Sequence, residues 1–417
     1  MTPMPRDPRP DSSLALLADP YGYVPKTCRR LESDVFEARL LLKPTICMSG
    51  AEAAELFYDP QRFVRRDAAP RRLVQSLFGK GGVQTLDDAA HRHRKQLFLS
   101  LMSRERIEAL VRAADAQWTR HAQAWSARSH VVLYHEAHEV LGRAVCDWAG
   151  VPVAEAEWPT RLRDLVALFD GAGAVGPRHW AARAARKRCD RWIAHLIEQS
   201  RAGRLHLPVD SPAHAVAFHR DLDSELLPAR VAAVELVNLL RPTIAVSVYV
   251  VFVALALEEF PEWRVRLQDA DAADDDATLR AFVQEVRRVY PFFPAVAARV
   301  REDFEWRGYR FPKGRRVMLD LYGTGRDPRR WPQPEAFMPE RFLSRTPGAF
   351  EFIPQGGGDH AVHHRCPGEW ITIELMKLAA RRLVRMRYAL PPQDLRIDAQ
   401  RLPALPRSRF VMAEVRD

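Results

Sequence analysis

The sequence predicts a mainly α-helical protein with a small β region, and three features of the residue pattern support this. From about Ser49 to Leu257, apolar residues return at three- and four-residue spacings and prolines cluster between segments, which is typical of helices. From Val296 to Leu321 the period changes to two, with a Pro-Lys-Gly turn at 312–314, which indicates a small antiparallel sheet. A stretch rich in Pro, Gly and Arg from Thr324 to Arg365 then leads into a helix that begins at Glu369.

The composition of two segments within this pattern predicts their structure. The longest apolar stretch, Ile244 to Leu257, is shorter than the roughly 20 residues of a membrane-spanning helix and ends in two glutamates. We therefore expect a buried core helix and no integral membrane segment. The acidic run Asp269 to Asp276 is expected to be a solvated loop before a helix over Phe282 to Tyr290.

Composition places the chain among ordinary globular proteins. Of 417 residues, 47% are hydrophobic and 28% charged, which excludes a disordered chain. The net charge of +10 could favour nucleic acid, membranes or anionic ligands. The arginines are scattered beside acids and form no basic stripe interleaved with aromatic residues, so solvated helix faces explain them better than a nucleic-acid surface. An anionic small-molecule substrate remains compatible.

Cysteine usage and the N-terminus bear on the compartment. The odd number of cysteines and the absence of a CxxC pair favour neither a disulfide framework nor a zinc ribbon, and fit a reducing environment. Residues 1–17 lack the apolar core of a signal peptide. We therefore expect a cytoplasmic protein. The five cysteines are Cys28, Cys47, Cys146, Cys189 and Cys366.

The most informative segment, 352–369, reads FIPQGGGDHAVHHRCPGE. It places Cys366 where a glycine-rich loop meets a helix. Glycines allow the backbone to approach a flat cofactor, and amides at a helix start stabilise a thiolate, as the axial ligand of a haem iron requires. One alternative is a buried structural cysteine. Another is zinc bound with His360, His363 or His364, although the spacing matches none of the common zinc patterns.

Two motifs upstream extend this interpretation. Glu285 and Arg288 stand three apart on a predicted helix and share a face, which alone is an everyday ion pair. The sequence PERF at 339–342 then supplies Arg341 before the cysteine loop. The order ExxR, PERF and cysteine loop resembles the cytochrome P450 family over nearly the whole chain.

The resemblance implies a single domain over residues 1–417 with the cytochrome P450 fold, a helical body with a small antiparallel β region, that binds haem b through Cys366. It also implies that Glu285, Arg288 and Arg341 form a structural network that shapes the cysteine loop. Two departures from the family pattern occur in this loop. Asp359 stands where the family has phenylalanine, and His363 stands where the resembling branch often has glycine, so we expect a less tightly packed loop with an altered thiolate environment.

Within the family, the chain most resembles the bacterial fatty-acid peroxygenases, which include α- and β-hydroxylases and an olefin-forming decarboxylase. The motifs that carry this resemblance are the triple-glycine loop with HRCPGE, HRHRK at 91–95, GAVGPRHW at 173–180, and Arg241-Pro242. The acid-threonine pair of typical monooxygenases is absent, since the segment 238–246 reads NLLRPTIAV. Hydrogen peroxide is therefore the expected oxidant, with no obligatory redox partner.

Arg241 is the clearest candidate for binding a substrate. A guanidinium within an apolar helix is costly to bury unless an anion meets it, and its planar fork suits a carboxylate. Pro242 removes a backbone donor and crowds the carbonyl of Asn238, which is expected to open the helix locally. The alternative is an internal salt bridge with Glu235 or another acid. In the resembling peroxygenases the arginine holds the fatty-acid carboxylate.

This resemblance implies a mechanism in which the substrate takes part. Peroxide activation needs a base and then an acid, and the clamped carboxylate can serve as both. The thiolate favours cleavage of the O–O bond. Because the carboxylate is held above the haem, we expect hydroxylation of long-chain fatty acids at Cα and/or Cβ.

Further candidates are assigned to the cofactor and the substrate. His91 and Lys95, four apart on one helical face, are expected to contact the haem propionates rather than solvent, and Arg65 matches a third such position in the family. Gln84 matches the position where the hydroxylating relatives carry glutamine and the decarboxylating relative carries histidine, which favours hydroxylation. Three aromatic residues either line the acyl channel or belong to the core: Phe78, Phe292 and Phe293.

Three other functions remain open from sequence alone. They are a fatty-acid decarboxylase that forms terminal alkenes, a reductase-dependent cytochrome P450 monooxygenase, and a haem-binding sensor or nucleic-acid binder without catalytic activity. The missing acid-threonine pair disfavours the second, and the absence of a regulatory or nucleic-acid motif disfavours the third.

Overall fold

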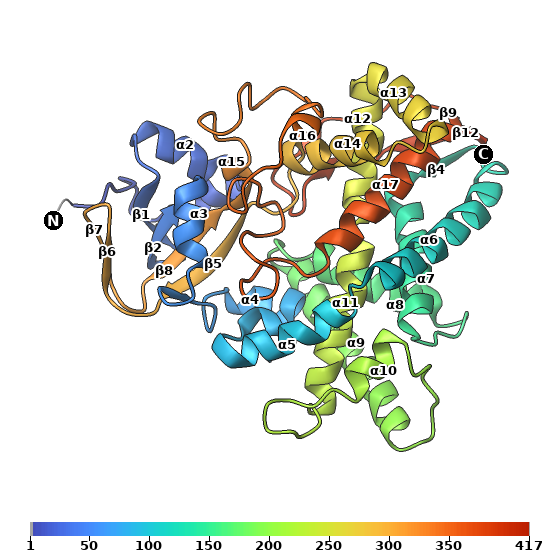
Figure 1. Cartoon of the computed structure of the whole chain (residues 1–417), viewed down its shortest axis with the longest axis horizontal. Helices are drawn as coiled ribbons and strands as arrows, with labels where there is room; N and C mark the ends of the chain where they lie inside the picture. The colour runs from blue at the N-terminus through green and yellow to red at the C-terminus, as the bar shows by residue number, and fades with distance from the viewer. Residues whose placement is uncertain (1–2, 417) are drawn as a thin grey trace.

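A computed structural model describes residues 3–416, in which a helical body lies beside a smaller region rich in strands (Figure 1). The helices are α1 Ser13–Ala18, α2 Tyr23–Arg30, α3 Ala51–Tyr58, α4 Arg71–Leu73, α5 Asp88–Ser100, α6 Arg104–Trp125, α7 Leu133–Ala149, α8 Trp158–Asp170, α9 Pro177–Arg201, α10 Pro212–Ala217, α11 Ala229–Ala245, α12 Ser247–Glu259, α13 Pro261–Ala272, α14 Asp276–Val289, α15 Leu321–Thr324, α16 Arg341–Ser344 and α17 Glu369–Arg385. The strands are β1 Val35–Leu40, β2 Lys43–Met48, β3 Phe63–Val64, β4 His130–Val132, β5 Ala295–Val300, β6 Phe304–Trp306, β7 Tyr309–Phe311, β8 Arg316–Asp320, β9 Arg387–Ala389, β10 Ile397–Asp398, β11 Leu405–Pro406 and β12 Val411–Arg416.

The main sheet has the strand order β1-β2-β8-β5-β3. The predicted antiparallel sheet is confirmed, because β5 pairs antiparallel with β8 and the hairpin of β6 and β7 lies between them in the chain. Strands β1 and β2 extend this sheet, and β2 pairs with β8 in parallel. Because these partners are far apart in the chain, the local period of β8 did not reveal them.

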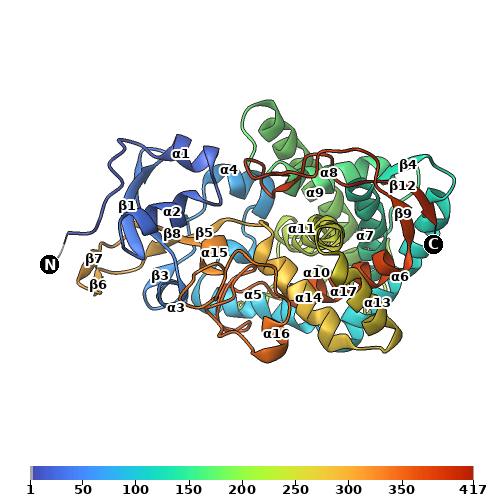
Figure 2. The ribbon, with the colours of Figure 1, turned by 90° about the horizontal axis from the view of Figure 1, so that it is seen from above.

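Helices α11 and α12 form the centre of the helical body, and Figure 2 views α11 nearly along its axis with α7, α8 and α9 around it. Together they span Ala229–Glu259, which is long and apolar enough to cross a membrane by length and composition, but 94% of its most apolar window is buried inside the protein. The predicted buried core helix over Ile244 to Leu257 is thus confirmed. Pro242 lies within α11, and the two helices are separated at Val246.

The prediction for the acidic run was wrong in its first half. Asp269 and Asp271 lie in the last turn of α13, where the C-terminal end of a helix disfavours negative charge. Asp271 is stabilised there by Arg381 and Arg385 of α17. The next helix begins earlier than predicted, because the Asp275 side chain caps α14 by accepting from two backbone N–H groups.

The region from Thr324 to Arg365 is irregular as predicted, apart from the single turn of α16. The helix predicted from Glu369 begins at that residue as α17. This long segment leads from the sheet to the start of α17, and its backbone therefore needs anchors outside regular secondary structure.

Candidate functional site

Glu285, Arg288 and Arg341 form the network that the sequence predicted. Nε and Nη2 of Arg288 each donate to the Glu285 carboxylate at 2.7 Å, and Nε of Arg341 lies 3.3 Å from the same carboxylate. Arg288 also donates to the backbone carbonyls of Pro334 and Ala336. Glu285 and Arg288 are buried and Arg341 is partly exposed; together these charges satisfy one another and anchor the irregular segment before the cysteine loop, which is a structural role.

Gln355 holds the cysteine loop against the start of α17, with its carbonyl as an acceptor and its side-chain amide as a donor. The backbone N–H of Cys366 donates to the Gln355 carbonyl at 2.9 Å, and Nε2 of Gln355 lies 3.8 Å from Sγ of Cys366. Gly356 has φ +98°, and a Cβ there would lie 3.1 Å from the carbonyl oxygen of His364. Glycine is therefore required at this turn.

Cys366 is half-buried, and its surroundings shift the pKa of its thiol in both directions. Burial raises its pKa, whereas the backbone N–H of Gly368 and the cations Lys95 and Arg287 lower it. A thiolate here therefore requires a further positive charge, which a metal ion bonded to sulfur would provide. Sequence reasoning missed Arg287 because its neighbour Arg288 carries the recognised motif.

Glu369, three residues after Cys366, is also paired. Arg287 donates to it, Arg365 Nε donates at 2.7 Å, and Nε2 of His360 lies 3.0 Å away. Although burial acts in the opposite direction, Arg287, His360 and Arg365 hold the pKa of Glu369 well below its usual range. Its negative charge is thus compensated within the loop.

The histidines of the loop contact other groups and do not surround the thiol. His360 contacts Glu369, His363 Nδ1 accepts from the backbone N–H of Asp359 at 2.8 Å, and His364 stacks on His91 at 3.8 Å between ring centroids. In the described part of the chain, no group of three or more His, Cys, Asp or Glu side chains could hold a metal ion. The geometry gives no support to the zinc alternative.

Asp359 and His363, which depart from the family pattern, both form contacts in the cysteine loop. Oδ1 of Asp359 accepts from the backbone N–H groups of Ala361 and Val362 at 2.7 and 3.0 Å. The His363 ring packs edge-on against Tyr58 and Phe350. The two residues that depart from the family pattern therefore close the turn themselves.

Arg65, His91, Lys95 and His364 lie together beside the cysteine loop, in a cluster whose cations are Arg65 and Lys95. The first three are buried, so the exposed-face alternative for His91 and Lys95 was wrong. Lys95 Nζ donates to the carbonyls of His363, at 3.1 Å, and Arg365, and the Arg65 guanidinium lies over the Phe57 ring. Burial lowers the pKa of Arg65 to about 10, of Lys95 to about 8 and of His91 to about 3.

This cluster fits a flat cofactor that carries carboxylates. Within residues 3–416, neither Arg65 nor Lys95 forms an ion pair, although burying an unpaired charge is costly. Two propionate groups of a haem would supply the missing anions while Cys366 ligates the iron. Sequence reasoning considered His364 only as a zinc ligand, because only the fold stacks it on His91.

Replacement of Lys95 by methionine tests this assignment. Lys95→Met keeps the length of the side chain and removes its charge, so it should weaken haem binding by about tenfold, as expected for one charge-assisted hydrogen bond. Haem content per protein, measured as the pyridine haemochrome, gives the result. Lys377→Met is the matched control, because Lys377 is buried but paired with Asp276 and Glu374. Unchanged haem affinity in Lys95→Met would remove this residue from the site.

Arg241 is buried in α11 without a carboxylate partner in the described chain. Its Nη2 lies 3.4 Å from Oδ1 of Asn238, and its Nε has no hydrogen-bond partner. Burial, and then the nearby guanidinium of Arg186, lower the pKa of Arg241 to about 9. The alternative partner Glu235 is instead bonded to Arg94 at 2.8 Å. The proposed internal salt bridge of Arg241 is therefore wrong.

Gln84 is linked to Arg241 by the side chain of Asn238. It is half-buried in the short 3-10 turn Val83–Thr85, and its Oε1 accepts from Nδ2 of Asn238 at 3.2 Å. Asn238 therefore contacts both predicted residues, Gln84 and Arg241. Sequence reasoning considered Asn238 only for its backbone carbonyl.

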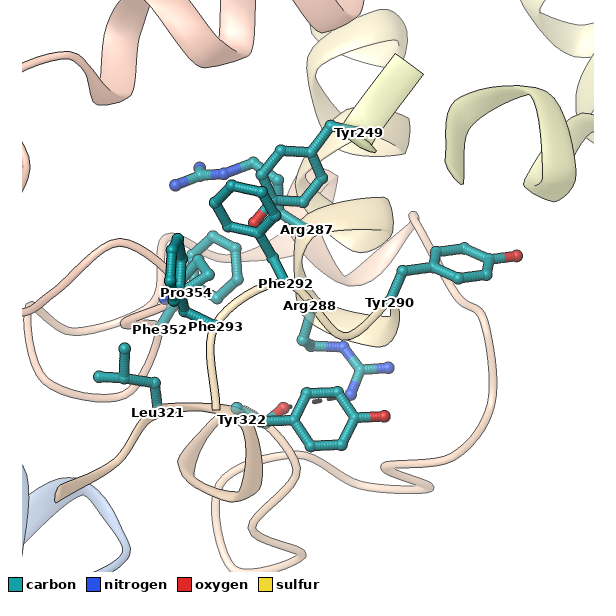
Figure 3. A pocket seen from close by; sticks show the side chains of 11 residues that line it. Tyr249, Arg287, Arg288, Tyr290, Phe292, Phe293, Leu321, Tyr322, Phe352 and Pro354 are labelled. Atoms are coloured by element: carbon teal, nitrogen blue, oxygen red, sulfur yellow. Dashed lines mark hydrogen bonds between the residues drawn. The ribbon is translucent and has the colours of Figure 1, made fainter. Parts of the chain in front are cut away.

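Two of the three aromatic candidates line a pocket. Phe292 and Phe293 pack edge-to-face at 4.9 Å and line a small pocket with Tyr249, Arg287 and other residues (Figure 3). Phe78 is not among the described residues that line this pocket; it ends a turn of π-helix and packs against the main core. Phe292 and Phe293 pack against this core as well, which agrees with the core alternative for all three residues.

Comparisons with known proteins agree with this geometry. The family model described as Cytochrome P450 matches residues 274–406. Vinorine hydroxylase from Rauvolfia serpentina is 37% identical over 134 residues, which cover 30% of this chain and 27% of that protein. Tabersonine 6,7-epoxidase isoform 1 from Catharanthus roseus is 36% identical over 136 residues, 30% of this chain and 26% of that protein. The chain thus matches about a quarter of the length of these curated relatives.

Solved structures match over nearly the whole chain. Cytochrome P450SP alpha in complex with (R)-ibuprofen is 51% identical with a TM-score of 0.94, and covers 98% of this chain and 99% of its own. Cytochrome P450EX alpha with myristic acid is 42% identical, and ligand-free cytochrome P450 OleT is 32% identical; both have TM-scores of 0.94 and cover 99% of each chain. With its ExxR network, its cysteine loop and this full-length similarity, the chain belongs to the cytochrome P450 family, in the fatty-acid peroxygenase branch that its motifs indicate.

Proposed function

We propose that the protein is a haem-thiolate peroxygenase that uses hydrogen peroxide to hydroxylate long-chain fatty acids at Cα and/or Cβ. The observation that carries this proposal is the buried guanidinium of Arg241, which has no carboxylate partner in the described chain and lies in a helix without the acid-threonine pair. A substrate carboxylate provides the missing anion. The overall reaction converts R–H and H2O2 into R–OH and H2O.

The cofactor proposed is haem b, held by Cys366 on the iron and by Arg65, His91 and Lys95 near its propionates. When bound, haem supplies the redox chemistry that cleaves the O–O bond and inserts one oxygen atom into a C–H bond. Cys366 contributes a thiolate that donates electron density to the iron. The cysteine loop positions this sulfur at the N-terminal end of α17, where Gly368 donates a backbone hydrogen bond to it.

Arg241 binds and orients the substrate. Its planar fork holds the carboxylate through two parallel N–H···O contacts, which fixes the acid end of the chain and presents Cα and Cβ first. The bound carboxylate accepts a proton from peroxide and returns it to the departing oxygen, so no acid-threonine pair is needed. Myristic acid and (R)-ibuprofen, the ligands of the two similar structures, are both carboxylic acids.

Product analysis tests this function. Purified haem-loaded protein should convert tetradecanoic or hexadecanoic acid to hydroxy acids with peroxide alone, as measured by mass spectrometry. Because the amide of Gln84 cannot donate a proton as an imidazolium can, hydroxy acids should exceed terminal alkenes. Terminal alkene as the main product would favour the decarboxylase alternative. Turnover only with a reductase and dioxygen would favour the monooxygenase.

The protein is further proposed to act as a single cytoplasmic domain over residues 1–417. All five cysteines are free in the structure, and four of them are buried, which suits a reducing compartment. The main hydrophobic core runs from Leu77 to Val415, so distant parts of the chain contribute to one core.

A further inference from the structure

The side-chain amide of Asn238 joins the two sides of the substrate site. Its Oδ1 lies 3.4 Å from Nη2 of Arg241, and its Nδ2 lies 3.2 Å from Oε1 of Gln84 and 3.4 Å from Oε2 of Glu235. Asn238 is buried, and it lies one turn before Arg241 on the same face of α11. This amide therefore contacts a donor on one side and two acceptors on the other.

The chemistry of its neighbours fixes which way this amide points. Arginine carries only donors, so it must face the amide oxygen of Asn238. An ionised Glu235 carries only acceptors, so it must face the amide nitrogen. Burial keeps the pKa of Glu235 above its usual value although Arg94 opposes this shift; the ion pair with Arg94 at 2.8 Å, itself held by Asp221 at 2.7 Å, presents the Glu235 oxygens as acceptors. Both neighbours thus select the same orientation. The flipped amide would place its NH2 group against the donors of Arg241 and its oxygen against the carboxylate of Glu235.

The orientation of the Asn238 amide determines the orientation of the Gln84 amide. Because Nδ2 of Asn238 is the donor, Gln84 must present its oxygen to it and turn its own Nε2 away. No residue in the described range 3–416 accepts a hydrogen bond from this Nε2, and the side chain is half-buried. Gln84 therefore offers an N–H donor without a partner in the described chain, and Asn238 links this side chain to Arg241.

Gly82 provides the space for this contact. A Cβ at this position would lie 2.9 Å from Nδ2 of Asn238 and 3.0 Å from Oε1 of Gln84. Its backbone, at φ −73° and ψ 157°, is one that any residue can adopt. The glycine is therefore needed for the amide contact and not for the turn itself.

We propose that Asn238 is a positioning residue that fixes Gln84 as a hydrogen-bond donor to the substrate carboxylate, so that Gln84 and Arg241 hold this group from two sides. The inference rests on the proposed function and deepens it. A carboxylate held from two sides has one orientation, and this orientation determines whether Cα or Cβ is hydroxylated. Asn238 thereby sets the ratio of the two hydroxy acids without contacting the substrate itself.

The test compares product ratios in single and double variants. Asn238→Ala should change the ratio of α- to β-hydroxytetradecanoic acid by about threefold or more, the effect of one neutral hydrogen bond. Its dissociation constant for tetradecanoate, from the substrate-induced change in absorbance, should change less than about threefold, because Arg241 retains the clamp. In the Gln84→Ala background, Asn238→Ala should leave the ratio unchanged, since two residues that act through one contact are not additive.

Two further variants distinguish the loss of the amide contact from simple misfolding. Gly82→Ala keeps both amides but intrudes between them, so it should shift the ratio in the same direction as Asn238→Ala. Thr243→Val is the matched control, because the Thr243 hydroxyl bonds only to the Leu239 carbonyl of its own helix. It should keep the wild-type ratio.

Separate results would overturn the inference and the proposed function. A wild-type ratio in Asn238→Ala, or an equal shift with and without Gln84, would overturn the role of Asn238 while hydroxylation by the wild type still supports the peroxygenase. Absence of hydroxy acids from the wild type with peroxide would overturn the proposed function and the inference with it.

Discussion

Arg241→Ala is expected to reduce peroxide-driven hydroxylation of fatty acids by more than tenfold. The side chain is buried and has no carboxylate partner within residues 3–416, and we propose that the substrate carboxylate is the anion it binds. Truncating one partner of a buried, hydrogen-bonded charge pair costs about 2–5 kcal/mol. Binding and the chemical step should both suffer, because the carboxylate is at once the anchor and the acid-base group.

The measurement is kcat/KM for tetradecanoic acid with peroxide, with haem content determined on the same samples. Haem content should stay near the wild-type value, because the cationic cluster at Arg65 and Lys95 lies on other elements. Arg241→Lys provides a comparison that keeps the charge but loses the planar fork, and it should recover only part of the activity. Wild-type kcat/KM in Arg241→Ala would remove this residue from the substrate site.

Cys366→Ala is expected to abolish both thiolate ligation and activity. No other cysteine can replace it, because Cys28, Cys47, Cys146 and Cys189 are all buried elsewhere in the fold. The ferrous carbonyl complex of the wild type should show the long-wavelength Soret band of thiolate-ligated haem, and the variant should lack it.

Cys189→Ala is the matched control for this experiment. Cys189 is a buried free thiol in α9, and burial raises its pKa to about 12. This variant should keep the long-wavelength band. Persistence of the band in Cys366→Ala would mean that another residue ligates the iron.

The parts of the fold with local signals were predictable from the sequence. The helix from Glu369, the antiparallel pair near residues 296–320 and the buried apolar helix were all predicted, because periodicity and turn residues act over a few positions. The pairing of β2 with β8 was not predictable, since its partners lie about 270 residues apart. Asp275 was assigned to a loop, but its side chain caps α14, so this helix begins earlier than predicted.

The same distinction applies to the site. Cys366 and Arg241 stand in recognisable contexts, a glycine-rich loop and an apolar helix, and the sequence identified both. Contacts across the fold were missed, such as the stacking of His364 on His91 and the bond from Asn238 to Gln84, which joins residues 154 positions apart. The sequence suggested Glu235 as a partner of Arg241, but Arg94, 141 positions away from Glu235, occupies it.

The central claim, that a carboxylate held by Arg241 activates peroxide, is tested most directly with a substrate that has no carboxylate. Styrene oxidation by peroxide should be slow alone and should rise when acetate or heptanoate is added, because the short acid supplies the acid-base group at Arg241. Arg241→Ala should not respond to the added acid. If the wild type oxidises styrene equally well with and without the acid, substrate-assisted activation is contradicted and the reductase-dependent monooxygenase becomes the better account.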